Sequence, residues 1–303
     1  MSERLRPMAP GEVLDQTFRL YRRHFLTFLC TATPACVLWY LFETFALSAM
    51  KLDSSETAFI VRIGLEIAAM TWAACLPLTW IAGGRWLSRP NRPMASIASA
   101  FGRLLRRTVS AATAIAVFLL GGLCGFLLMS LMSAIESRFP SFPFNSPLRA
   151  LNDIFSLLAG TAGFGLLVWS LISPMLVLPA SMLEDLGPIA TVRRGFHLLR
   201  GAQRTLVFLL AAGAAIHIVA WGLVNLPLEI VYAILSSREG GVTVYLRLQS
   251  AVQNLAFAFS LPIPSIGLAL TYYNQRVIRE GYDIQALLAE LPPAAGTNVS
   301  GLK

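Results

Sequence analysis

Three ionisable side chains stand out because they lie inside stretches that are otherwise apolar. Arg62 and Glu66 are four positions apart within the apolar stretch of about residues 58–84, and His217 lies well inside a later one. Ionisable groups within membrane-spanning segments are costly, so each is a functional candidate. The i, i+4 spacing of Arg62 and Glu66 allows an ion pair on one helix face, although Arg62 could instead extend to the lipid headgroups. For His217 the alternatives are a hydrogen bond to a neighbouring helix and a role as ligand or proton relay.

No catalytic or metal-binding motif is visible elsewhere in the sequence. It contains no P-loop, no glycine-rich dinucleotide motif after a strand, no HExxH and no nucleophile elbow. The three histidines have no carboxylates at the spacing of a metal site, and the four cysteines form no CxxC or Cys/His pattern. We therefore expect no enzymatic activity, no metal and no cofactor, and we interpret the cysteines as small buried hydrophobic side chains.

A second kind of candidate is the arginines of three basic amphipathic segments. In EVLDQTFRLYRRH, SIASAFGRLLRRT and TVRRGFHLLRGAQR, apolar residues recur at i, i+4 and i+7, which predicts an apolar helix face. The residues of these faces are Leu14, Phe18 and Tyr21; Ile97, Phe101 and Leu104; and Val192, Phe196 and Leu199. Such helices either lie in the membrane interface or pack on one another as a collar.

Arginine clusters beside membrane-spanning helices attract anionic lipid. This explains the interleaved basic and aromatic residues without nucleic acid, which we do not expect as a partner. The candidate headgroup contacts are Arg22, Arg23, Arg106, Arg107, Arg193, Arg194 and Arg200.

The composition predicts an all-α polytopic membrane protein. Of the 303 residues, 56% are hydrophobic and 13% charged, and the mean hydropathy is +0.65. Globular proteins carry about 25% charged residues. Six stretches are long enough to cross a bilayer, which needs ~20 apolar residues. They cover about residues 25–50, 58–84, 109–135, 151–183, 205–235 and 248–273.

The six predicted spans fall into three similar units. Each unit has a basic amphipathic helix, an outgoing span, a short loop and a returning span with prolines late in it, which indicates a pseudo-repeat. We expect a single membrane domain over residues 1–291 and a disordered tail over 292–303. The repeats cover about residues 10–84, 94–183 and 187–275. Gly121 and Gly125 have the GxxxG spacing that lets helix backbones approach closely in lipid.

The distribution of basic residues predicts the orientation. With six spans both termini share one face, which carries 18 of the 24 Lys and Arg residues, against five on the other face and Arg62 within a span. The positive-inside rule places the richer face, and therefore both termini, in the cytoplasm.

Three stretches carry a resemblance to a known family: GEVLDQTFRLYRRHFLTFL, LEDLGPIATVRRGFHLLRG and LTYYNQRVIREGYDIQALLAEL. They resemble the bacterial membrane-domain family named after glycerophosphoryl diester phosphodiesterase. Asn274 stands where that pattern has an aspartate, and the catalytic barrel fused to some members is missing. The resemblance implies a polytopic helical domain in a bacterial cytoplasmic (inner) membrane, without the phosphodiesterase activity.

Three functional hypotheses follow. The first is a non-catalytic scaffold or accessory protein that contacts anionic or glycerophospholipid headgroups and assists a protein partner. The second is a small transporter or lipid flippase-like carrier that uses the proline-broken helices and His217. The third is an intramembrane enzyme, which the small number of buried acids and histidines disfavours.

Overall fold

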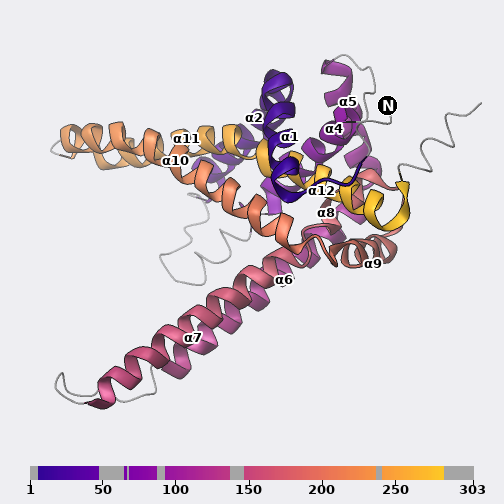
Figure 1. The fold of residues 1–303 in the computed structure, drawn as a ribbon. Coiled ribbons are helices and arrows are strands. Elements are labelled where there is room, and N and C mark those ends of the chain that lie inside the picture. The colour runs from indigo at the N-terminus through magenta and orange to yellow at the C-terminus, as the bar shows by residue number, and fades with distance from the viewer. Residues whose placement is uncertain are drawn as a thin grey trace, which may run out of the picture.

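A computed structural model describes residues 6–47, 65–66, 68–86, 93–136, 147–236 and 241–282. Within these residues the regular structure is helical, without strands (Figure 1). Five helical stretches are long and apolar enough to cross a membrane: Phe25–Thr44, Thr108–Gly125, Gly160–Leu183, Gln203–Leu235 and Arg247–Glu280. The predicted span of about residues 58–84 lies partly outside the described residues, so the sixth span stays a prediction, as does the tail over 292–303.

The three amphipathic segments form separate surface helices, α1 (Pro10–Arg23), α5 (Pro93–Arg106) and α9 (Pro188–Leu199). Helices α1 and α9 begin with proline, whose fixed φ suits the first turn. In α1 the Glu12 carboxylate also accepts the Ala9 N–H at 3.1 Å, which satisfies one free donor of the first turn.

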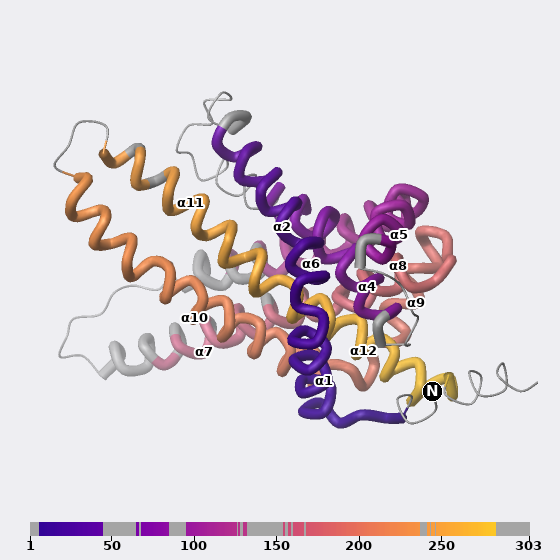
Figure 2. The backbone as a smooth tube through the Cα atoms, turned by 90° about the horizontal axis from the view of Figure 1, so that it is seen from above, coloured from indigo at the N-terminus to yellow at the C-terminus, as the bar shows by residue number. Residues whose placement is uncertain are grey.

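Each surface helix is followed by a longer apolar helix: α2 (Phe25–Leu41), α6 (Thr108–Glu136) and α10 (Gln203–Leu235). Helix α2 continues as a π-helical segment over Phe42–Leu47. Two long returning helices are described, α7 (Pro147–Ile172) and α11 (Gly241–Ser260). The α6–α7 and α10–α11 hairpins extend from the body of the protein as two separate arms (Figures 1 and 2).

The returning segments break where prolines remove backbone donors. Helix α7 ends just before Pro174 and α11 ends just before Pro262, while a π-helical turn over Thr71–Cys75 precedes Pro77. After each break comes one of the helices at the centre of the fold: α4 (Leu76–Trp86), α8 (Val177–Leu183) and α12 (Pro262–Glu280).

The core forms where these three helices meet. Side chains of α4 such as Leu78 and Ile81 pack with Ile266 and Leu270 of α12, and Leu76 packs with the apolar residues of α8. The surface helices pack around this core, α5 on α4, α9 on α8, and α1 on α12. The first and last described helices are therefore neighbours.

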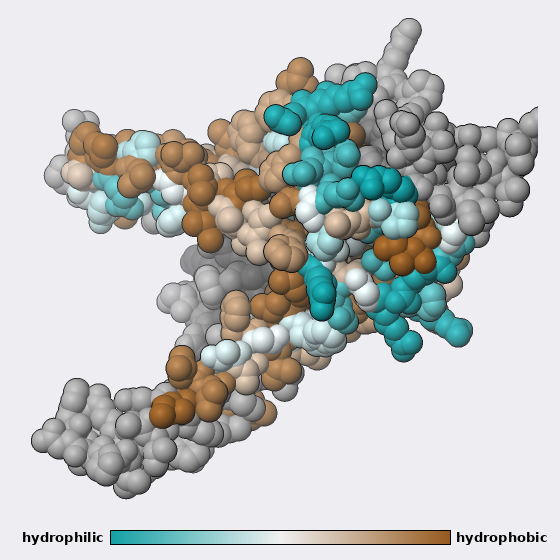
Figure 3. Space-filling model, in the orientation of Figure 1, coloured by the Kyte–Doolittle hydropathy of each residue, from teal (hydrophilic) through white to brown (hydrophobic). Residues whose placement is uncertain are grey.

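Polar and apolar surfaces are separated between the body and the arms. Hydrophilic residues gather around α1 and α9, whereas the coloured part of the α6–α7 arm shows mainly apolar and pale residues, and the α10–α11 arm shows apolar residues with a hydrophilic patch among them (Figure 3). In the apolar stretch of α10 only 6% of the residues are buried. Such a face is typical of contact with lipid chains.

Candidate functional site

At three points on the surface, exposed arginines are followed within one helical turn by exposed large apolar side chains. Each point lies where a surface helix leads into an apolar helix. The pairs are Arg22 and Arg23 with Leu26 (71% exposed), Arg106 with Val109 (69%), and Arg204 with Phe208 (61%). A charged group beside an exposed apolar one matches the boundary between headgroups and hydrocarbon chains.

Helix α9 presents a mixed face of the same kind. Ile189, Arg193 and Phe196 follow one another at i, i+4 and i+7, and all three are exposed, Ile189 by 85%. The sequence pattern predicts one apolar face that contains Phe196 and Leu199, and the structure buries only part of it, since Leu199 is buried and Phe196 is exposed. The buried face is instead centred on Gly195, whose missing side chain lets α9 approach the backbone of α8 at Val177.

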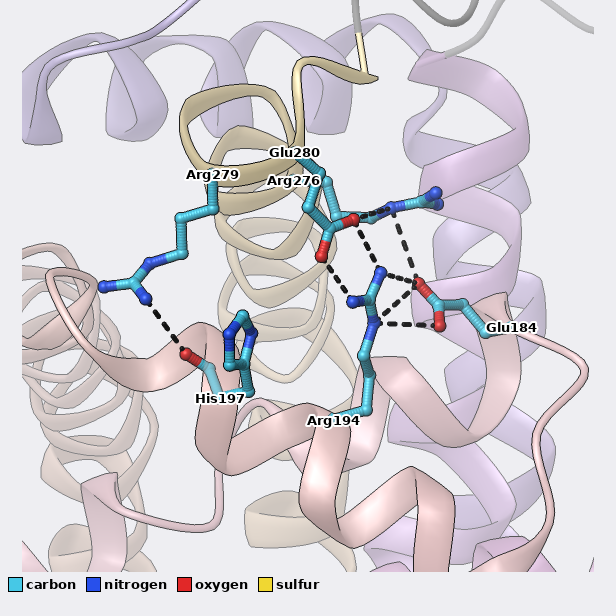
Figure 4. Close-up of polar contacts among 6 residues, drawn as sticks. All are labelled: Glu184, Arg194, His197, Arg276, Arg279 and Glu280. Carbon is cyan, nitrogen blue, oxygen red and sulfur yellow. Dashed lines mark hydrogen bonds and ion pairs between the residues drawn. The ribbon is translucent and has the colours of Figure 1, made fainter.

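A cluster of alternating charges lies behind this surface, between α9, α12 and the segment after α8 (Figure 4). Arg194 donates from Nε to Glu184 Oε2 at 3.0 Å and from Nη2 to Glu280 Oε2 at 2.6 Å. Arg276 Nε lies 3.4 Å from both Glu184 Oε1 and Glu280 Oε2. Burial alone would lower the pKa of Arg194, but its hydrogen bonds to the two carboxylates outweigh that effect and raise it.

The segment after α8 is also fixed from its other side. Asp185 forms ion pairs with Arg103 and Arg107, and these arginines also donate to the carbonyls of Met182 and Leu186. The hydrogen bond from Arg107 and the charge of Arg103 hold the pKa of Asp185 below its ordinary value. The adjacent acids Glu184 and Asp185 thus connect the segment after α8 to α5, α9 and α12, which is a structural role.

The seven predicted headgroup arginines divide into two groups. Arg107 and Arg194 are only partly exposed and are held by carboxylates. The exposed ones, which remain available to a ligand, are Arg22, Arg23, Arg106, Arg193 and Arg200.

The three intramembrane candidates are not placed together as a site. Arg62 lies outside the described residues, so its pairing with Glu66, which is half-buried, stays a prediction. His217 on α10 shares a hydrogen bond with Ser260 on α11, with Nδ1 and Oγ 3.1 Å apart, and its ring contacts Phe257. This is the hydrogen bond to a neighbouring helix that was one of the two alternatives. The described residues contain no group of three or more His, Cys, Asp or Glu side chains that could hold a metal.

Two sets of polar residues were missed by the sequence analysis. Asn274 was noted only as a departure from a family pattern, yet its side-chain amide binds both the N–H and the carbonyl of Met8. The others lie on α10 and α11, where Asn225 and Glu229 continue the i, i+4 series through His217. That spacing was a signal in the sequence for a polar helix face.

Replacing Arg194 with glutamine is expected to lower the free energy of unfolding by about 1–2 kcal/mol. The change removes one of the two arginines that hold Glu184 and Glu280. Arg276, which stays 3.4 Å from both carboxylates, and the partial exposure of the cluster limit the loss. Thermal unfolding in detergent micelles measures the effect. The matched control is Arg193→Gln, one position away and exposed, which should change little; equal losses in both variants would contradict a specific role for the cluster.

These observations define the class of protein: an all-helical chain with five described helices long and apolar enough to cross a membrane. Comparisons with known protein families, with curated proteins and with solved structures found no match. The family resemblance therefore stays an expectation.

Proposed function

We propose that this chain is a non-catalytic integral membrane protein that binds anionic phospholipid headgroups at the cytoplasmic face of a bacterial inner membrane, as a scaffold or accessory to a protein partner. The observation that carries the proposal is the three points where exposed arginines meet exposed apolar side chains, together with the mixed face of α9. An arginine in this position contributes ~1 kcal/mol to the binding free energy of anionic lipid, and the contributions of several arginines on one face add up.

The proposal includes six spans in three related units, with both termini in the cytoplasm. The packing supports such units, because each surface helix lies on one of the central helices: α5 on α4, α9 on α8 and, between the two ends of the described chain, α1 on α12. This is the arrangement expected of three units in a closed cycle. The excess of arginine on one face supports the orientation.

The test compares the lipids that remain bound after purification. The protein is extracted from mixed vesicles of phosphatidylglycerol and phosphatidylcholine into mild detergent, and the retained lipids are measured by mass spectrometry. The wild type should retain an excess of phosphatidylglycerol. Replacing Arg22, Arg23, Arg106, Arg193 and Arg200 by glutamine should lower that excess by about tenfold, a modest effect for five such contacts.

The matched control replaces the same five arginines by lysine. Attraction to a headgroup depends mainly on charge, so the lysine variant should keep most of the phosphatidylglycerol, whereas recognition through the planar guanidinium would be lost. The proposal is wrong if the wild type shows no preference for the anionic lipid, or if the glutamine variant keeps it while unfolding at the wild-type temperature.

A further inference from the structure

The α10–α11 hairpin carries a line of polar side chains between its helices. On α10 they are His217, Asn225 and Glu229, and on α11 they are Tyr245, Gln249 and Ser260. We refer to these six residues as the polar seam. The α10 residues recur at multiples of four positions and therefore share one helix face.

The two helices face each other in a constant register. Tyr245 donates to Glu229 Oε1 at 3.4 Å, and four positions further along each helix Gln249 donates to Asn225 Oδ1, also at 3.4 Å. Eight more positions along, His217 lies against Phe257 and binds Ser260. The seam therefore extends for about 18 Å along α10, more than half the thickness of the hydrocarbon layer.

The two ends of the seam lie beside different parts of the molecule. Glu229 is exposed and lies six residues before the end of α10 at Leu235. At the other end Ser260 precedes the proline break, where the Tyr21 hydroxyl donates to the Phe259 carbonyl at 2.9 Å. Tyr21 directly precedes Arg22 and Arg23, so the seam reaches the arginine-bearing surface.

Polar groups can hold two transmembrane helices together. A second hairpin of the protein, α6–α7, shows how its helices pack by other means. The α6–α7 hairpin contains a close contact at Gly121, where an added Cβ would lie 2.6 Å from the Ser170 carbonyl. Small residues of this kind are sufficient to pack helices in lipid. Polar groups are costly within a membrane, and the α6–α7 hairpin shows that this protein can pack two helices without them. The seam therefore needs another explanation than helix packing.

An unpaired acceptor lies on α11, five positions after Gln249. Asn254 is 93% buried, and its amide nitrogen donates to the Ser250 carbonyl at 2.9 Å, while its Oδ1 has no hydrogen-bond partner. Ser250 in turn donates to Glu43 of the α2 extension at 2.7 Å. A buried acceptor without a partner is costly, and a ligand that brings hydrogen-bond donors would relieve that cost.

We propose that the polar seam is a path along which the headgroups of aminophospholipids cross the membrane while their chains stay in the lipid. The flanks of the hairpin are open to lipid, since Ile218, Leu226 and Ile230 are exposed on α10. The titratable side chains of α10 in the seam are His217 and Glu229, and Glu43 of the α2 extension accepts from Ser250, which follows Gln249 in α11. The hydrogen-bond acceptors and the carboxylate of the seam fit the ammonium N–H donors of an ethanolamine headgroup better than they fit an anionic headgroup.

The experiment measures lipid transfer between leaflets. The full chain is reconstituted into phosphatidylcholine vesicles that contain phosphatidylethanolamine or phosphatidylglycerol with a fluorophore on the acyl chain, and dithionite quenches the outer leaflet. The wild type should transfer the ethanolamine lipid faster than empty vesicles do, and faster than the glycerol lipid. The variant N225L/Q249L should lower this rate by about tenfold, because the middle of the path loses its polar groups.

Two controls separate transfer from folding. The variant N225Q/Q249N keeps an amide at each position and should keep most of the rate. The variant T113V/T161V removes two hydroxyls from the other hairpin, where each binds only a carbonyl of its own helix, and should leave the rate unchanged. If N225L/Q249L does not fold, the single changes are measured separately, and each should lower the rate.

The proposal is overturned if the wild type moves neither lipid faster than empty vesicles, or if folded variants without the amides keep the wild-type rate. In that case the seam only joins two helices. The path does not depend on the proposed binding of anionic lipid, because none of the substituted arginines lies in the seam. Failure of one test therefore leaves the other intact.

Discussion

Replacing Gly195 by alanine is expected to lower the free energy of unfolding by about 3 kcal/mol, near the upper end for an overpacked site. A Cβ at this position would lie 2.5 to 2.7 Å from Val177, and two of the three nearest atoms belong to the backbone, N and Cα. Helix α9 would have to move away from α8, which would disturb the apolar packing of Leu198 and Leu199. The loss would appear as a lower unfolding temperature in detergent.

The matched control is Gly102 on α5, also within a basic amphipathic helix. Nothing lies within 4 Å of the position that its Cβ would take. Gly102→Ala should therefore stabilise the protein by about 0.5–1 kcal/mol, the ordinary gain from a better helix former. A wild-type unfolding temperature for Gly195→Ala would show that α8 and α9 do not cross this closely.

Replacing Asn274 by aspartate is expected to lower the free energy of unfolding by about 3 kcal/mol, because it places a charged group in a buried position and leaves the Met8 carbonyl without its donor. The side chain is 2% exposed, accepts the Met8 N–H at 2.8 Å and donates to the Met8 carbonyl at 3.0 Å. An aspartate has no donor for that carbonyl, so two oxygens would face each other. Thermal unfolding gives the total loss, and proteolysis near residue 8 shows whether the N-terminal segment detaches.

Met8→Ala is the control for this prediction, because Asn274 binds only the main chain of Met8. The alanine variant keeps both hydrogen bonds and should lose only the modest packing of a partly buried side chain. An aspartate variant as stable as wild type would mean that the segment before α1 is not held by this pair.

Helix type and the existence of the described spans could be predicted from the sequence. Long apolar runs predict helices because lipid offers no other partner for backbone polar groups, and the runs at α6 and α10 appear as continuous helices. The prolines also marked the breaks before α8 and α12 correctly. Pro227 is different, since it lies inside α10 without ending the helix.

The partners of individual side chains could not be predicted, because they come from distant parts of the chain. Arg106 and Arg107 are equivalent in the sequence, but only Arg107 faces Asp185, 78 positions away. Gly102 and Gly195 cannot be distinguished before the position of α8 is known. Asn274 binds a residue 266 positions away, so its role depends on the contact between α12 and the segment before α1.

That contact has a consequence for biosynthesis. The ribosome makes α1 first and α12 last of the described helices, yet Val13 of α1 is buried in the cluster that contains Tyr273 and Val277. During insertion, α1 must therefore wait with its inner face uncovered until almost the whole described chain has been made. A chain that stops before α12 would leave its earliest helix without a docking partner, and we expect such a product to be degraded.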